Sequence, residues 1–369
     1  MVRRTLLAVT FFSIAAFSAA AVRAEILIGM AGPMTGPNAW LGEQTQRGAE
    51  LAIAELLAKG GVLRQAVRVV TADDFCRGDQ AVAAARKLVH DGVAVVFGHP
   101  CSGAAIPASQ VYAEAHILMI SNAATNPKLT ERNLGNVFRV VGRDDQQGLI
   151  AGRYLAERWR DHKIAIMHDG QIYGQGLAQY AQQQLDALGV REAVFEQIEP
   201  GRLDYSDLIA KMQALNVDVL YYGGYAPEAG LMMRQAGDRR YQLQLVAGDG
   251  INSEDFWLIA GGAAEGTLMT SYPDVSAKPA AAEVVARFRA EHYEPIGSTL
   301  YGYAAVQAWA QAVEAVGTFE ADAVAAALRT HQFDTVLGKI GFDAKGDVTG
   351  YDTFVWYVWR GGKYAPLEP

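Results

Sequence analysis

Two loops rich in small polar residues are the part of the chain best suited to hold a charged small molecule. The apolar runs 93–97 and 117–121 are each followed by such a loop, HPCSG after the first and NAATN after the second. The segment 103–115 between them has helical character, so the pattern is that of a parallel crossover unit. In open α/β sheets, ligands bind beyond the carboxyl ends of the strands. Small side chains leave backbone N–H groups approachable there, and a helix starting near Ser102 adds its positive end, which predicts the anion-holding half of a site.

The rest of the chain supplies the scaffold that such a site needs. Across residues 25–271, short apolar runs alternate with segments of helical periodicity, and glycine-containing loops join them. This alternation predicts an α/β fold with two doubly wound sheets. The sequence contains no Pro/Ser-rich linker, low-complexity segment or short repeat. We therefore expect the two lobes to be joined by several short crossings and to move as a hinged clamp.

The N-terminus has the pattern of an export signal. An arginine pair precedes the uncharged stretch 5–22, which ends in Val-Arg-Ala, with small residues at the two positions that define cleavage. We predict a secretory signal peptide over residues 1–24, cleaved after Ala24. A membrane anchor is the alternative, because the apolar run is long enough to span a bilayer.

The mature chain would be acidic and large enough for two domains. Of the 32 Lys and Arg residues, three lie in the predicted signal peptide, which leaves 29 against 40 Asp and Glu, a net charge of −11. This balance argues against nucleic acid and anionic membrane surfaces as partners. The remaining chain also exceeds the usual size of one hydrophobic core.

The two cysteines are expected to pair. An exported chain with two cysteines favours one disulfide, Cys76–Cys101, which would join the loop after the strand at 68–72 to the loop after the strand at 93–98. In the chain-entropy account, closing a loop of this length stabilises the fold by roughly 3 kcal/mol. Two unpaired thiols are the alternative.

Catalytic and cofactor-binding patterns are missing from the sequence. His99 lies near Ser102, but GHPCS is not a nucleophile elbow and no triad order is evident. The sequence contains no Walker motif and no GxGxxG between a strand and a helix. The seven histidines lack metal-ligand spacing. We therefore expect a protein that is not an enzyme and needs neither a cofactor nor a metal.

Several loops together resemble a known family. The motifs GPMTGP, DDFC, GHPCS, SNAATNPKLT, HDGQIYGQGLA, YYGGYAPEAG and YAAVQ stand in the order and spacing of periplasmic branched-chain amino-acid-binding proteins. These are the substrate-binding components of ABC importers, and the resemblance covers nearly the whole mature chain. It implies the type I periplasmic binding protein fold, with three crossings between an N-terminal lobe (25–143 plus 273–350) and a C-terminal lobe (144–272 plus 351–369).

The resemblance also implies a function and a set of site residues. The protein would be a monomeric periplasmic receptor that passes an amino acid, branched-chain or otherwise apolar, to the permease subunits in the inner membrane. Ser102 matches the serine that holds the ligand carboxylate, and Cys76 and Cys101 match the family's disulfide. The remaining ligand-contacting positions are Ala123, Ala124 and Thr125 in the second loop, Tyr173 and Tyr225 in the far lobe, and Asp249.

These residues suit the chemistry of an α-amino acid. The carboxylate needs donors, which Ser102, Thr125 and loop N–H groups provide, and the ammonium needs acceptors such as Asp249 and the carbonyl of Ala123. Leucine-binding members often carry Glu where this chain has Asp249, one methylene shorter, so the leucine preference is not transferred directly. Weaker candidates for a pocket wall are Trp40 in the first loop, Cys101, and Tyr301 at the start of a late helix.

Plainer roles are open for each of these residues. Ser102 could serve as nothing more than a helix cap, and Thr125 and Asp249 could be turn residues. Tyr173 could pack on its own lobe, and Trp40 could be an ordinary loop aromatic. An amide or aromatic acid as ligand, or a sensor built on the same lobes, are the alternatives to amino-acid transport.

Overall fold

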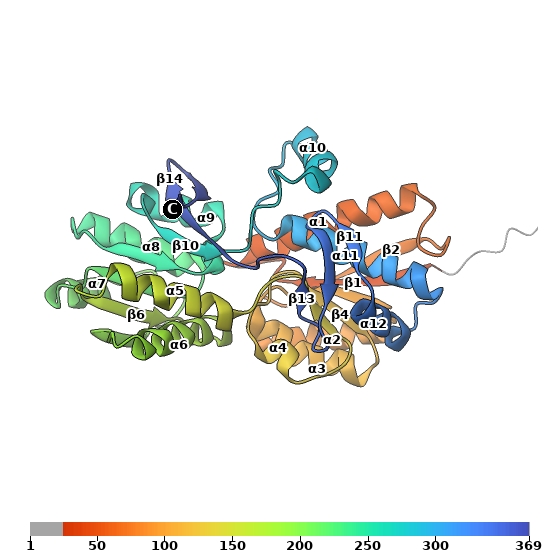
Figure 1. Ribbon diagram of the computed structural model, residues 1–369, viewed down its shortest axis with the longest axis horizontal. Helices are drawn as coiled ribbons and strands as arrows, with labels where there is room; N and C mark the ends of the chain where they lie inside the picture. The colour runs from red at the N-terminus through yellow and green to blue at the C-terminus, as the bar shows by residue number, and fades with distance from the viewer. Residues whose placement is uncertain (1–24, 369) are drawn as a thin grey trace, which may run out of the picture.

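The computed structural model describes residues 25–368, which fold into two α/β lobes that lie side by side (Figure 1). The predicted signal peptide, residues 1–24, lies outside the described residues. Within the described part of the chain, no helix combines the length and apolar character needed to cross a bilayer.

The first lobe is built on a five-stranded parallel sheet with the strand order β2-β1-β3-β4-β5. Its central strands are buried on both faces, which explains their continuous apolar sequence. In β3, Val95 and Phe97 point into one core cluster and Val96 into the other. The strands are β1 (Ile26–Gly32), β2 (Val67–Asp73), β3 (Val95–Gly98), β4 (Leu118–Ser121) and β5 (Val137–Arg139).

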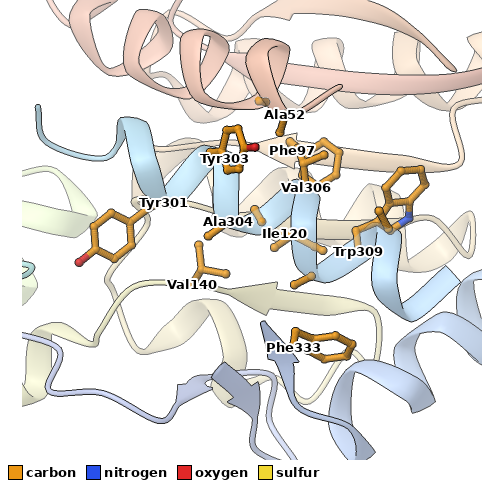
Figure 2. Packing of buried hydrophobic residues seen from close by; sticks show 14 of the residues in the cluster. Ala52, Phe97, Ile120, Val140, Tyr301, Tyr303, Ala304, Val306, Trp309 and Phe333 are labelled. Carbon is orange, nitrogen blue, oxygen red and sulfur yellow. The ribbon is translucent and has the colours of Figure 1, made fainter. Parts of the chain in front are cut away.

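Helices cover both faces of this sheet. The core on one face is formed largely by an Ala-rich helix, whose Trp309 packs edge-on against Phe97 with ring centroids 5.9 Å apart. Figure 2 shows Ala304, Trp309 and Ile120 in this core, with Phe333 from a later strand beside them. The helices of this lobe are α1 (Ala39–Ala58), α2 (Gly78–Asp91), α3 (Ser102–Glu114), α4 (Lys128–Glu131), α11 (Thr299–Val316) and α12 (Ala321–Thr330).

The second lobe contains a seven-stranded sheet with the order β15-β14-β10-β9-β8-β6-β7. Strands β6 to β10 run parallel, while β14 and β15 add an antiparallel edge. The strands are β6 (Ile164–His168), β7 (Val194–Gln197), β8 (Val219–Gly223), β9 (Gln244–Ala247), β10 (Leu268–Ser271), β14 (Val355–Arg360) and β15 (Lys363–Pro366). The helices are α5 (Asp144–Arg158), α6 (Ile172–Ala187), α7 (Ser206–Ala214), α8 (Ala226–Asp238) and α9 (Glu254–Ala260), with short 3₁₀ turns η1 (Asp249–Ile251) and η2 (Gly261–Ala264).

The chain passes between the two sheets three times. It leaves the first sheet after β5, returns after β10 and leaves again before β14. The remaining elements are η3 (Pro279–Ala281), α10 (Ala282–Ala290) and a small antiparallel sheet of β11 (Phe333–Thr335), β12 (Gly338–Phe342) and β13 (Val348–Thr349). The predicted fold of two doubly wound lobes joined by three crossings is confirmed.

Some predicted details are wrong. The apolar pattern of residues 137–143 predicts a strand, but β5 ends at Arg139, although Val140 and Val141 are completely buried. These two residues belong to the first crossing and pack in the core of the first lobe, so burial without a continuing strand explains the apolar pattern there. Helix α1 begins at Ala39, so Trp40 lies in a helix and not in the first loop. The small sheet was missed because strands of two to five residues show little period-two pattern.

Candidate functional site

Ser102 ties the two predicted anion-binding loops together. It is the first residue of α3, directly after β3, and Cys101 is the residue at the N-cap position. The Ser102 hydroxyl accepts a hydrogen bond from the backbone N–H of Asn126, 3.1 Å away. Because the hydroxyl acts as an acceptor here, its own O–H can donate to a ligand. The helix-cap alternative is not what the structure shows.

A buried arginine fixes the loop around Thr125 through hydrogen bonds. Arg139, at the end of β5, donates to the carbonyl oxygens of Ala124 and Asn126 at 3.1 and 3.0 Å. Ala123 is also buried in this loop, and the Thr125 hydroxyl has no hydrogen-bond partner among the described residues. A fixed loop with a free, buried hydroxyl suits a ligand that arrives with its own polar groups.

The second lobe contributes a carboxylate framed by two tyrosines. The Tyr173 hydroxyl, from α6, donates to Asp249 Oδ1 at 3.1 Å and accepts from the N–H of Gly250 at 2.9 Å. The rings of Tyr173 and Tyr225 lie 5.2 Å apart, centroid to centroid. Tyr225 precedes α8 and Asp249 begins η1, so all three residues follow parallel strands at the carboxyl edge of the sheet.

The two sets of residues face one another across the lobe boundary. The Asn126 side chain donates to the carbonyl oxygen of Ile172 at 3.0 Å, which places the Thr125 loop against the start of α6. Gln44 in α1 reaches the carbonyl oxygen of Asn252 at 3.4 Å. Ser102, Thr125 and Asp249 are at most 5% exposed. The lobes are therefore closed over the site.

The electrostatics of the site are dominated by buried carboxylates. Burial raises the pKa of Asp249 from 3.8 to about 6, although hydrogen bonds from Gln147 and Tyr173 lower it. Burial, followed by the charge of Asp249, raises the pKa of Asp144 well above 3.8. Asp144 was not recognised from the sequence, because an Asp at the start of a helix normally indicates only a favourable dipole interaction.

Of the weaker wall candidates, Trp40 and Cys101 belong to the same buried apolar cluster as Ala123, Tyr173 and Tyr225. Trp40 lines a groove of about 740 Å³ together with Glu254, Asp255 and Tyr293. Tyr301 lies at the second crossing, where its hydroxyl donates to the carbonyl oxygen of Pro273 at 2.8 Å. Tyr301 thus packs where the chain passes between the lobes. Tyr301 also lines a small cavity of about 40 Å³ together with Asn252 and Tyr272, and its role as a wall of the ligand pocket stays a prediction.

The disulfide and a buried polar chain support the loop that carries Ser102. Cys76 and Cys101 are bonded, as predicted. Asp74 accepts from the backbone N–H of Cys76 at 2.7 Å and contacts His99 Nδ1 at 2.6 Å, while His99 Nε2 lies 3.0 Å from the Tyr112 hydroxyl. His99 is therefore fully used in packing this loop. Within residues 25–368, no cluster of three or more His, Cys, Asp or Glu side chains is arranged to hold a metal ion.

Comparisons with known proteins agree with this architecture. A family model described as "Periplasmic binding protein" matches residues 25–363. The Leu/Ile/Val-binding protein homolog 1 of Brucella suis is 46% identical over 348 residues, which cover 94% of each chain.

Two solved structures extend the comparison. The branched-chain amino acid transporter substrate-binding protein LivJ from Streptococcus pneumoniae, in complex with isoleucine, is 25% identical with a TM-score of 0.84 and covers 94% of this chain and 100% of its own. An ABC transporter substrate-binding protein from Desulfitobacterium hafniense, in complex with Leu, is 29% identical with a TM-score of 0.75. The match covers 93% of this chain and 100% of the other. These are binding proteins and not enzymes, which confirms the expectation drawn from the sequence.

Proposed function

Because the chain belongs to the periplasmic binding protein family, we propose that it captures an apolar amino acid and delivers it to an ABC permease. The three relatives reported above carry leucine, isoleucine or valine in their names or titles. A branched-chain amino acid is therefore the first ligand to test, with other apolar amino acids next.

The observation that carries this proposal is the opposition of two polar groups across the closed lobes. The first lobe offers donors, namely the hydroxyl of Ser102 at the N-terminal end of α3 and that of Thr125 in the loop after β4. The second lobe offers the Asp249 carboxylate, with Tyr173 and Tyr225 beside it. An α-amino acid carries an anion and a cation on one carbon, and both charges must be satisfied when the site closes.

Transport would depend on opening and closing of the lobes. We propose the boundaries 25–143 plus 273–350 for one lobe and 144–272 plus 351–369 for the other, which the three crossings between the sheets support. The site is nearly inaccessible in the closed form, so a ligand must enter and leave through an open form. We further propose a periplasmic monomer whose signal peptide is removed after Ala24.

Calorimetric titration of the mature protein tests the proposal. The panel consists of leucine, isoleucine, valine, phenylalanine, glutamate and short-chain amides. We expect the apolar amino acids to bind most tightly, and we expect Asp249→Asn to abolish their binding while the fold is retained. Tight binding of an amide or an aromatic acid, with no amino acid bound, would overturn the amino-acid assignment. Unchanged binding in the variant would remove Asp249 from the ammonium site.

A further inference from the structure

Tyr272 is a buried tyrosine whose hydroxyl the fold leaves without a partner. It directly follows β10, where the second crossing begins, and it is 2% exposed. Its ring packs against that of Tyr301, with the centroids 5.0 Å apart. The hydroxyl has no hydrogen-bond partner among the described residues. Because an unpaired buried hydroxyl is costly, a ligand or a water molecule is expected to meet it.

The topology of the second sheet places Tyr272 on the same edge as the candidate site. Strands β10, β9, β8 and β6 are consecutive parallel neighbours in this sheet. The residues that follow these four strands are, in the same order, Tyr272, Asp249, Tyr225 and Tyr173. The carboxyl ends of parallel neighbours meet at one edge, where ligands bind. The row of second-lobe site residues therefore extends to Tyr272.

The surroundings of Tyr272 belong to both lobes. Burial raises the pKa of Tyr272 well above 10.0, and the charge of Asp249 is the next largest cause, so the two side chains are close. Tyr301, near the start of α11, extends from the edge of the first-lobe core (Figure 2). Tyr272 thus lies between Asp249 of the second lobe and Tyr301 of the first.

A small cavity lies beside Tyr272. Its volume is about 40 Å³, and Asn252, Leu300 and Tyr301 line it together with Tyr272. One water molecule needs roughly 10–15 Å³, so the cavity has room for a few atoms. Its lining combines the apolar Leu300 with the polar side chain of Asn252. Such a space suits the end of a short side chain that carries a polar atom.

The main-chain groups of an amino-acid ligand are already assigned to other residues. Its carboxylate is assigned to the hydroxyls of Ser102 and Thr125, and its ammonium group to Asp249. The part of the ligand that reaches Tyr272 is therefore the side chain. A phenol hydroxyl can donate one hydrogen bond and also accept, so it can pair with either kind of polar group.

We propose that Tyr272 is a specificity-determining residue, whose hydroxyl pairs with a hydroxyl or amide on the ligand's side chain and disfavours a side chain that is wholly apolar. This assignment rests on the proposed function as an amino-acid receptor, and it concerns discrimination between side chains of the same shape. A buried polar group left without its partner typically lowers affinity by about 5- to 150-fold. A site that pairs with a polar group of its ligand discriminates in this way against the analogue that lacks the group.

The test uses pairs of amino acids that share a shape and differ in polar atoms. Threonine has a hydroxyl where valine has a methyl group, and asparagine has nearly the shape of leucine. Wild type and Tyr272→Phe are titrated calorimetrically with all four amino acids. Tyr222→Phe is the matched control, because the Tyr222 hydroxyl is also buried and unpartnered among the described residues, but its core cluster contains none of the candidate site residues.

The expected result is a change in discrimination and not a general change in affinity. Tyr272→Phe should bind valine and leucine more tightly, because phenylalanine fills the same space without a group that loses its partner. It should bind threonine and asparagine more weakly. The ratio of threonine to valine affinity should fall by about 5- to 150-fold, with asparagine and leucine changing in the same direction. In Tyr222→Phe both ratios should stay within about twofold of wild type.

Urea unfolding separates this role from a purely structural one. Since the Tyr272 hydroxyl has no partner in the fold, Tyr272→Phe should be as stable as wild type or more stable. A less stable or unfolded variant would show that the protein itself holds the hydroxyl, and would overturn the proposal.

Three titration results would also overturn the role of Tyr272. They are affinity ratios within twofold of wild type in Tyr272→Phe, an equal change in the Tyr222→Phe control, and a wild type that binds other amino acids but neither threonine nor asparagine. Failure of wild type to bind any amino acid would instead overturn the proposed function, and this inference with it.

Discussion

The position of Asp249 suits a cationic ligand but lowers the stability of the ligand-free protein. Its carboxylate is buried, with hydrogen bonds from Tyr173 and Gln147 and no cationic partner among the described residues. Burial raises its pKa to about 6, so at neutral pH the folded chain must hold a charge that the interior disfavours. Binding sites commonly give up stability in this way for function.

Replacing Asp249 by Asn should therefore stabilise the ligand-free protein at high pH. Because the pKa of Asp249 is raised in the folded state, its buried charge does not destabilise the fold below about pH 3.8. The destabilisation grows as the pH rises and is complete above about pH 6. We expect Asp249→Asn to raise the free energy of unfolding by about 3 kcal/mol at pH 8 and by almost nothing at pH 4. Urea unfolding of wild type and variant at both pH values measures this. An equal difference at both pH values would show that ionisation is not the cause.

Single residues were predicted from the sequence only where position and side-chain chemistry agreed. Ser102, Thr125 and Asp249 each follow a strand and lie where parallel strands end, so their convergence followed from topology. Asp144 escaped notice because nothing in the sequence distinguishes an unpaired buried Asp from an ordinary helix-start residue. Trp40 was placed in a loop, because the first turn of its helix follows directly on a turn-rich segment.

At the scale of elements, a buried ion pair joins β5, whose last residue supports the Thr125 loop, to the segment before β13. Arg139, at the end of β5, pairs with Asp347, just before β13, at 2.6 Å. Asp347 also accepts from Thr130 at 2.8 Å and from Arg143 at 2.9 Å. Burial alone would raise the pKa of Asp347, but the two arginines hold it below 3.8. Arg139 also holds the carbonyl oxygens of Ala124 and Asn126, on either side of Thr125. Losing its ion pair should therefore affect both the stability of the fold and the geometry of the candidate site.

Removing Asp347 should destabilise the protein and weaken ligand binding. Asp347→Ala leaves the fully buried Arg139 without its carboxylate, which typically costs about 3–5 kcal/mol. Since the pKa of Asp347 is lowered in the folded state, its contribution is present above about pH 3.8 and is lost on further acidification. Chemical unfolding and leucine titration at pH 7 measure both effects.

The control for this variant is an ion pair on the surface. Asp334 lies 3.2 Å from Lys339, and the two side chains are 81% and 59% exposed. Asp334→Ala should change the free energy of unfolding by less than about 1 kcal/mol and leave ligand binding unchanged. If the two variants are equally stable, the buried pair is not what holds the loop.

Elements were predicted most reliably where burial and periodicity coincide. The sequence pattern predicts helices over 79–91, 144–159 and 301–316, and α2, α5 and α11 differ from these ranges by one or two residues at one end only. Their apolar positions repeat every three to four residues, and Gly92 and Gly317 end two of them in a left-handed conformation. The small sheet β11–β13 was missed, since its strands are held by the first lobe's core and not by their own pattern. A local sequence pattern does not indicate such long-range contacts.

At the scale of the whole molecule, closure depends on how closely the two lobes can approach. Gly176, in α6 of the second lobe, lies directly against the Asn126 side chain of the first lobe. A Cβ atom at Gly176 would come within 2.6 Å of Asn126 Nδ2, which is itself engaged with the carbonyl oxygen of Ile172. The missing side chain at this position thus permits the closed form, although glycine within a helix costs stability.

A large side chain at Gly176 should hold the lobes apart without harming either one. Gly176→Leu removes a helix-weakening glycine, so the ligand-free protein should be as stable as wild type or more stable. Closure would require Asn126 to move away and give up its bond across the boundary. A ligand that binds the closed form then loses affinity in proportion to the population of that form, by tenfold or more.

Small-angle scattering together with titration measures this effect. Wild type should become more compact when leucine is added, whereas Gly176→Leu should remain extended and bind weakly. Gln183→Leu, at an exposed position later in the same helix, should behave like wild type in both respects. Full compaction of Gly176→Leu with wild-type affinity would show that the approach of α6 to the Thr125 loop does not limit closure. Loss of affinity with unaltered compaction would place the effect within the site and not at the hinge.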